Sequence, residues 1–217
     1  MKKFIFTLNW KANPTTLAQG QAILDCYPPT NHKVVTYCPS IFVGNLKTSL
    51  TLGVQDICEF ENGAYTGQIT ASQVSDMGIS HTMIGHGETN NTPAQVLAKV
   101  KLALENGIHP LVCVGSLTEP FEDLVEQLDV LKEIDYPLWI GYEPIWAIGT
   151  GKTPTMLDIE TTIGKIKNYL GKDDIKVLYG GSVSSKNIEE LKAISNLDGF
   201  VVGGACLKPS EIQILLS

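Results

Sequence analysis

The chain has 217 residues, of which 43% are hydrophobic, and a formal net charge of −7. This length and composition predict a single domain, residues 1–217, with one substantial core, because too little chain remains for two comfortable domains. The acidic balance argues against a nucleic-acid partner and against an anionic membrane surface, since each of these requires a basic face.

The N-terminal run Met1–Leu8 turns polar at Asn9, which makes it too short for a signal peptide or a membrane span. The five cysteines are scattered singly, with no C-x-x-C pair. This spacing predicts neither a metal site nor a disulfide framework, and an odd number of cysteines fits a reducing compartment. We therefore expect a cytoplasmic protein.

Eight short apolar runs, mostly β-branched or aliphatic, recur along the chain and predict strands. They lie near Phe4–Leu8, Val34–Cys38, Leu52–Gln55, Thr82–Ile84, Leu111–Val114, Trp139–Tyr142, Val177–Tyr179 and Phe200–Val202. Continuous apolar runs of this length are typical of parallel strands that are covered on both faces.

Amphipathic stretches separate the predicted strands and predict helices. They are expected at Leu17–Tyr27, Ile41–Leu50, Ser72–Met77, Pro93–Asn106, Phe121–Ile134, Leu157–Leu170, Asn187–Ile194 and Pro209–Leu216. Eight such strand and helix pairs predict either a closed parallel barrel or a doubly wound open sheet, and the pattern alone does not choose between the two. The chain is shorter than the roughly 250 residues typical of such barrels, so its helices and loops must be trimmed.

Polar and glycine-rich segments follow the predicted strands rather than precede them. These segments are Asn9–Asn13, Gly85–Asn91, Glu143–Lys152, Gly180–Ser182 and Gly203–Ala205. In parallel α/β folds the ends of the strands form the active face, which predicts a site there. Any one of these glycine clusters could equally be an ordinary turn.

The same segments resemble the triosephosphate isomerase family in order and position. The matching motifs are Asn9-Trp10-Lys11-Ala12-Asn13, Ile84-Gly85-His86-Gly87-Glu88, the eleven residues Tyr142–Lys152, Tyr179-Gly180-Gly181-Ser182 and Gly203-Gly204-Ala205. The eleven-residue segment is very specific, whereas G-G-S alone is weak. The resemblance implies a (β/α)8 TIM barrel, an isomerase of glycolysis and gluconeogenesis that interconverts dihydroxyacetone phosphate and D-glyceraldehyde 3-phosphate, and neither a cofactor nor a metal.

The resemblance also assigns catalytic roles. It implies that Glu143 is the base, that His86 is the neutral electrophile, and that Lys11 supplies positive charge to the enediolate and the phosphate. Asn9 is expected to orient this region and to touch the substrate, and Glu88 to pair with Lys11. Without the resemblance, a surface glutamate, a structural histidine or a solvated lysine would be the ordinary interpretation.

Phosphate contacts are implied for Lys11 and for the backbone N–H groups of Gly149, Ser182, Gly203 and Gly204, where a short helix N-terminus adds favourable partial charge. The segment Pro144-Ile145-Trp146-Ala147-Ile148-Gly149-Thr150-Gly151-Lys152 resembles the family's mobile lid. Trp146 could instead be a plain core residue. Lid closure would exclude water from the reacting intermediate.

Several positions depart from the family pattern. Gly87, Thr89 and Asn90 stand where the family has serine and two arginines, and Gln68 replaces a glutamate that pairs with the first arginine. Because both partners change together, the ion pair is expected to be replaced as a unit. Gly87 lacks a hydroxyl that contacts the base, which predicts reduced turnover. Ser116 replaces a carboxylate that supports the open lid.

The segment Glu61–Gly67 resembles the loop that enters the neighbouring subunit, with Thr66 approaching the partner's Asn9 and Lys11. A homodimer is therefore expected, and the trimmed helices leave a tetramer open. Two other functions remain possible from the sequence: a different phosphosugar enzyme on the same barrel, and a non-catalytic binding or assembly protein. The segment Tyr142–Lys152 argues against the first, and the intact Asn9, Lys11, His86 and Glu143 argue against the second.

Overall fold

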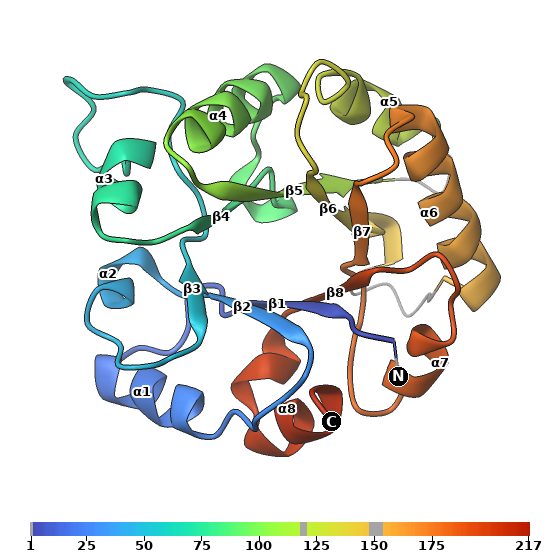
Figure 1. Ribbon diagram of the computed structural model, residues 1–217, viewed down its shortest axis with the longest axis horizontal. Helices are drawn as coiled ribbons and strands as arrows, with labels where there is room; N and C mark the ends of the chain where they lie inside the picture. The colour runs from blue at the N-terminus through green and yellow to red at the C-terminus, as the bar shows by residue number, and fades with distance from the viewer. Residues whose placement is uncertain (1, 118–120, 148–153) are drawn as a thin grey trace.

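The computed structural model describes residues 2–117, 121–147 and 154–217. Its centre is one sheet of parallel strands (Figure 1). These strands are β1 (Ile5–Asn9), β2 (Lys33–Tyr37), β3 (Thr51–Gly53), β4 (His81–Ile84), β5 (His109–Gly115), β6 (Trp139–Glu143), β7 (Lys176–Tyr179) and β8 (Gly199–Val202). Each lies within two residues of its predicted bounds at either end.

Strand order decides between the two folds that the sequence pattern allowed. The order β3-β2-β1-β8-β7-β6-β5-β4 leaves β3 and β4 at the two edges. An isolated parallel bridge between Val54 and Thr82 joins those edges, with the Val54 N–H 3.1 Å from the His81 carbonyl oxygen and the Met83 N–H 2.9 Å from the Val54 carbonyl oxygen. The sheet therefore closes into a nearly complete (β/α)8 barrel, which confirms the predicted fold class.

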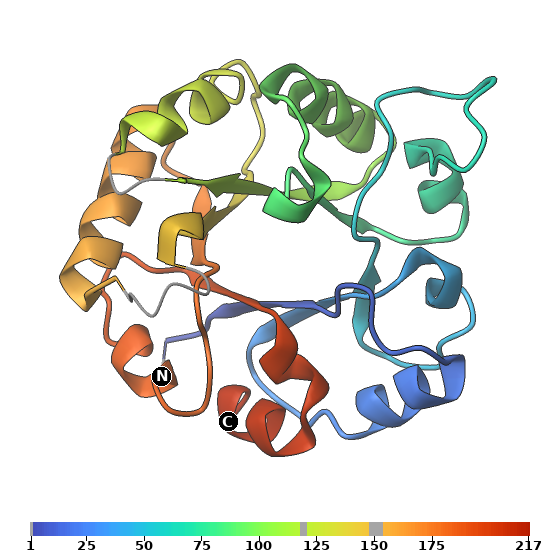
Figure 2. The same cartoon turned by 180° about the vertical axis from the view of Figure 1, so that it is seen from behind.

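Helices surround the strands and cover the outer face of the barrel (Figures 1 and 2). They are α1 (Leu17–Asp25), α2 (Ser40–Val43), α3 (Ala71–Asp76), α4 (Pro93–Glu105), α5 (Glu122–Asp129), α6 (Met156–Leu170), α7 (Ile188–Lys192) and α8 (Pro209–Leu215). Thr70, Thr92 and Thr155 begin α3, α4 and α6 with capping boxes, which satisfy N–H groups that have no partner inside the helix.

Two predicted helices were too long. The helix predicted over Ile41–Leu50 ends at Val43, because the backbone of Lys47 bonds to the side chain of Gln21 on α1 through both its N–H (2.8 Å) and its carbonyl (2.9 Å). The helix predicted over Phe121–Ile134 ends at Asp129. There the Lys172 ammonium donates to the carbonyls of Leu131 and Ile134. In both places a distant side chain replaces the bonds that a longer helix would make.

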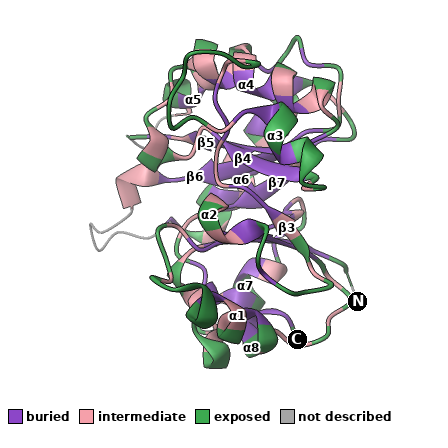
Figure 3. Ribbon diagram, turned by 90° about the vertical axis from the view of Figure 1, so that its left-hand side faces the viewer, coloured by how far each residue is buried: buried purple, intermediate pink, exposed green. Residues whose placement is uncertain are grey.

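Two apolar layers hold the barrel together. The interior layer contains Val35, Tyr37, Met83, Leu111, Cys113, Trp139, Leu178 and Val201. A larger layer lies between the sheet and the helices, and the side view shows the strands buried inside a more exposed helical shell (Figure 3). Neighbouring strand residues such as Val34 and Val35 belong to different layers because successive side chains point to opposite faces.

Three histidines lie where strands begin, at the end of the barrel away from the polar segments. His81 and His109 start β4 and β5, and their rings stack with centroids 5.5 Å apart. Burial lowers the pKa of each to about 4, so both are neutral near pH 7. His32 packs against Phe6 and accepts the Phe4 N–H at 3.2 Å. These contacts indicate structural roles for the three histidines.

Over the described residues, none of the helices has both the length and the apolar character needed to cross a bilayer.

Candidate active site

A cavity of about 440 Å³ opens where the strands end. Figure 2 looks onto this end, with the short turns η1 (Gly87–Thr89), η2 (Ile145–Ala147) and η3 (Gly204–Leu207) around the opening. The cavity is lined by Asn9, Lys11, His86, Gly87, Glu88, Leu117, Glu143, Ile145, Gly180, Gly181, Ser182, Val201, Gly203 and Gly204. Segments that are up to 195 residues apart in sequence meet there because the strands are parallel and end on the same side.

Glu143 is the last residue of β6, and its residue surface is only 5% exposed. Gly180, which follows β7, makes room for it, since a Cβ there would lie 2.9 Å from Glu143 Cγ. Burial raises the pKa of Glu143 to about 7, because a carboxylate loses hydration when water is excluded. A carboxyl group with this pKa can accept a proton and return it near neutral pH.

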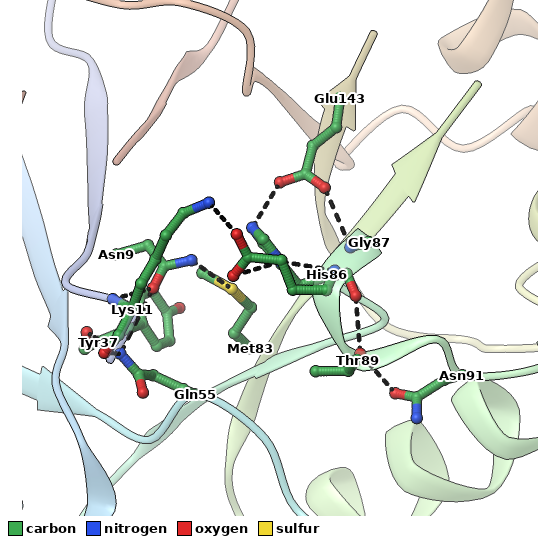
Figure 4. A network of polar contacts seen from close by, with 11 residues as sticks. Asn9, Lys11, Tyr37, Gln55, Met83, His86, Gly87, Thr89, Asn91 and Glu143 are labelled. Carbon is green, nitrogen blue, oxygen red and sulfur yellow. Dashed lines mark hydrogen bonds and ion pairs between the residues drawn. The ribbon is translucent and has the colours of Figure 1, made fainter. Parts of the chain in front are cut away.

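His86 faces Glu143 across the cavity, with 3.2 Å between Nε2 and Oε1 (Figure 4). It caps η1, and its Nδ1 accepts the Glu88 backbone N–H at 3.2 Å. In the neutral ring the proton is therefore on Nε2, the atom that points toward the carboxylate. Burial lowers the pKa of His86, and the nearby Lys11 charge lowers it further, so the neutral form prevails near pH 7.

Lys11 follows β1 and pairs with Glu88, with 2.5 Å between Nζ and Oε1. Its backbone is left-handed, with φ of 53°, which is uncommon for a residue other than glycine and is found at functional sites that surrounding contacts hold in place. The negative charge of Glu88 stabilises the Lys11 ammonium beside the cavity. The pKa of Glu88 is lowered in turn by Lys11, although partial burial opposes this shift.

The contacts that hold the strained Lys11 turn come from Asn9 and Gln55. Asn9 Oδ1 accepts the Lys11 backbone N–H at 2.9 Å. Gln55 Nε2 donates to the Lys11 carbonyl at 2.8 Å and to the Tyr37 carbonyl at 3.1 Å, so it links the segments after β1 and β3 to the last residue of β2 (Figure 4). The apolar pattern placed Gln55 at the end of a predicted strand and did not indicate this role. The available signal was a polar residue at the end of a predicted apolar run.

The remaining wall presents backbone groups rather than charges. Ser182, Gly203 and Gly204 line the cavity, and η3 begins directly after Gly203. A turn of this kind directs backbone N–H groups outward, which suits an anion. Of the residues predicted to bind phosphate, Gly149 lies outside the described residues.

The predicted lid begins within the described part of the chain and continues beyond it. Pro144 is buried after Glu143, and Ile145, Trp146 and Ala147 form η2. The Trp146 backbone N–H donates to the Ser116 carbonyl at 3.1 Å, and the Ser116 backbone N–H donates to the Glu143 carbonyl at 3.2 Å. These bonds fix the start of the segment beside Glu143. Ile148, Gly149, Thr150, Gly151 and Lys152 lie outside the described residues.

A metal site was not expected from the sequence. Within residues 2–117, 121–147 and 154–217, His, Cys, Asp and Glu side chains do not gather in groups of three or more that could hold a metal ion.

Comparison with known proteins connects this geometry to a family. The family model described as triosephosphate isomerase matches residues 4–217. The chain is 37% identical to the triosephosphate isomerase of Mesomycoplasma hyorhinis, with 100% of the chain and 99% of the relative covered. It is 34% identical to the enzyme of that name from Candida albicans (100% and 98% covered) and 31% identical to that from Colwellia psychrerythraea (100% and 97% covered).

The chain belongs to the triosephosphate isomerase family. This membership confirms the resemblance that the five sequence motifs indicated.

The departures from the triosephosphate isomerase pattern have structural counterparts. At Gly87, where the family has serine, the backbone N–H faces Glu143 Oε2 at 3.4 Å, so one donor contact to the carboxylate persists without the hydroxyl. Thr89 donates to the His86 carbonyl at 2.7 Å. Gln68 is exposed, with its N–H bonded to the Tyr65 carbonyl, and Asn90 adopts a left-handed backbone after η1.

Proposed function

We propose that this chain interconverts dihydroxyacetone phosphate and D-glyceraldehyde 3-phosphate through an enediolate, with Glu143 as the base and His86 as the electrophile. Family membership supports the reaction, which belongs to glycolysis and gluconeogenesis. One observation supports the roles: a carboxylate that is 5% exposed lies 3.2 Å from a neutral imidazole, in the cavity that Lys11 also lines.

In the first step, the Glu143 carboxylate removes a proton from C1 of dihydroxyacetone phosphate. The C–H electron pair becomes the C1–C2 double bond, and the carbonyl pair moves onto the C2 oxygen. The Nε2–H of His86 and the Lys11 ammonium stabilise the resulting negative charge. Asn9 holds the Lys11 turn, and the Glu88 carboxylate pairs with the Lys11 ammonium.

In the second step, the proton moves from the C1 hydroxyl to the C2 oxygen by way of His86. Glu143 then returns its proton to C2, which leaves an aldehyde at C1. The sum is an internal transfer of hydrogen with no net oxidation. A base whose pKa is about 7 suits both halves of this sequence, because it must accept a proton and release it again.

The phosphate group is proposed to bind the opposite wall, through the backbone N–H groups of Ser182, Gly203 and Gly204 together with Gly149, and to be attracted by Lys11. The exposed backbone groups at the start of η3 support this assignment. We further propose that the segment from Pro144 to Lys152 closes over the bound substrate and excludes water, which would protect the enediolate.

Replacing the base tests the mechanism. Glu143→Gln keeps the shape of the side chain but has no basic oxygen, so turnover should fall by about 10²-fold to 10⁴-fold, the range for loss of a general base. The measurement is a coupled assay with glyceraldehyde 3-phosphate on purified protein. Glu189→Gln, in which an exposed glutamate on α7 is changed, is the matched control and should retain wild-type turnover. Unchanged turnover in Glu143→Gln would rule out the proposed mechanism.

We also infer that the chain works in the cytoplasm as a homodimer. The loop 61–67 supports the dimer: its residues are exposed, and its Tyr65 ring stacks on that of Phe60, the residue before the loop, with centroids 3.8 Å apart. Figure 1 shows this loop standing away from the barrel beside α3. Thr66 in this loop is the proposed contact with the partner subunit, and a tetramer is the alternative assembly.

A further inference from the structure

An ion pair between a buried lysine and a partly exposed aspartate lies behind the catalytic cavity, and the proposed mechanism does not use it. Lys99 on α4 is 4% exposed, and its Nζ lies 2.7 Å from Asp56 Oδ2 in the segment after β3. Burying an ammonium group is costly unless its hydrogen bonds are satisfied. The Lys99 ammonium also donates to Asn91 Oδ1 at 3.1 Å, in the loop that joins η1 to α4.

The polar contacts continue from Asn91 to the catalytic turn. Asn91 Oδ1 lies 3.1 Å from the Thr89 hydroxyl, and that hydroxyl donates to the His86 carbonyl at 2.7 Å (Figure 4). The Thr89 backbone N–H reaches the same carbonyl at 2.8 Å. The His86 carbonyl is therefore held by two donors, and one of these donors is in contact with the network around Lys99.

A hydroxyl group has a single proton, and Thr89 has two acceptors within reach. The shorter distance favours the His86 carbonyl. Asn91 Oδ1 already receives a proton from Lys99, which reduces its competition for the Thr89 proton. Without Lys99, the Thr89 hydroxyl would donate to Asn91 Oδ1 instead, and the His86 carbonyl would lose one of its two hydrogen-bond donors.

We propose that Thr89 is a positioning residue for His86. The pair of the buried Lys99 with Asp56 acts through Asn91 and keeps the Thr89 hydroxyl directed at the His86 carbonyl. The orientation of the imidazole depends on η1, because His86 Nδ1 accepts the Glu88 N–H from within that turn. A change in the turn therefore changes the direction of Nε2 toward Glu143. As a role in catalysis, this inference rests on the proposed function.

Two substitutions at one position test it. Thr89→Val removes the hydroxyl and keeps the shape, and should lower kcat by about 3-fold to 10-fold, the equivalent of one neutral hydrogen bond, with KM changed by less than about 2-fold. Thr89→Ser keeps the hydroxyl and should restore kcat to within about 2-fold of wild type. The imidazole nitrogens of His86, followed by ¹⁵N NMR at several pH values, should shift in the valine variant only.

The charged end of the network is tested without leaving an orphan charge. Lys99→Met alone would leave the Asp56 carboxylate without its ion-pair partner, so the variant tested is the double change Lys99→Met with Asp56→Asn. It should lower kcat as Thr89→Val does, and adding Thr89→Val should reduce kcat little further, because the changes act on one contact. The control removes an exposed ion pair that Lys101 on the same helix makes with Glu133 after α5, Lys101→Met with Glu133→Gln, and should leave kcat unchanged.

The outcomes separate this inference from the proposed function. If the wild type shows no isomerase activity, the proposed function fails, and the His86 resonances still decide whether Thr89 positions the ring. If the wild type is active but Thr89→Val matches Thr89→Ser in both kcat and the His86 resonances, the inference is overturned. If the charge-free double variant does not fold, the comparison of valine and serine at position 89 decides alone.

Discussion

Burial sets Glu143 apart from the glutamates on the surface of this chain. The residue ends a strand that lies between β5 and β7, and only 5% of its surface is exposed. The Gly87 N–H and the Lys11 charge each lower the pKa, but burial outweighs them and brings it to about 7. At Glu88, which is far more exposed, burial also raises the pKa, but the hydrogen bond and the charge of Lys11 together with nearby His86 outweigh it and lower the pKa.

The raised pKa predicts a pH dependence of kcat/KM. Because the base acts as the carboxylate, kcat/KM should fall as the pH drops through about 7, approaching a tenfold loss per pH unit below it. The substrate phosphate titrates near pH 6, so its ionisation is measured separately by ³¹P NMR and the profile is corrected. A corrected midpoint near 4.5, the ordinary value for glutamate, would contradict the burial argument.

At the scale of elements, the close pairing of β1 with β8 brings Lys11 near the glycines of the opposite wall. Gly199 pairs with Ile5, and a Cβ at Gly199 would lie 2.0 Å from the Ile5 carbonyl oxygen. The Ile5 carbonyl is a backbone group, so it cannot change rotamer to make room for a Cβ as a side chain can. The position therefore requires glycine for close approach of two strands, although its φ angle is ordinary.

Gly199→Ala should consequently lower the free energy of unfolding by about 1–3 kcal/mol or more, because the strands must separate to admit the methyl group. Equilibrium denaturation in urea measures the change. Gly164→Ala is the matched control: it lies within α6, its Cβ would be 3.5 Å from Asn196 Nδ2, and alanine should stabilise the helix by about 0.5–1 kcal/mol. Equal behaviour of the two variants would refute the strand-packing argument.

At the scale of the whole molecule, the barrel holds its proposed catalytic residues together, whereas the residues of the loop 61–67 are exposed. An exposed loop whose Tyr65 ring stacks on Phe60 suits a contact with a second subunit. The wild type should therefore sediment with twice the mass of one chain, and four times would indicate the tetramer.

Thr66→Arg places a charge in this loop and should shift the protein toward the monomer at micromolar concentration, because an unpaired charge is costly at an interface. Sedimentation equilibrium measures the shift. Thr161→Arg, which changes an exposed threonine on α6, should leave the mass unchanged. A wild type that sediments as a monomer would contradict the proposed assembly.

The sequence by itself determined the eight strands, the parallel class of the fold and the rim on which the polar residues gather. These properties depend on the apolar pattern of neighbouring residues and on the rule that parallel strands end on one side. Tertiary structure alone decided the closure through Val54 and Thr82, the early end of α2, the contact between His86 and Glu143, and the network from Lys99 to Thr89. Each of these depends on distance and burial between residues far apart in the chain, which the packed barrel creates and local pattern does not encode.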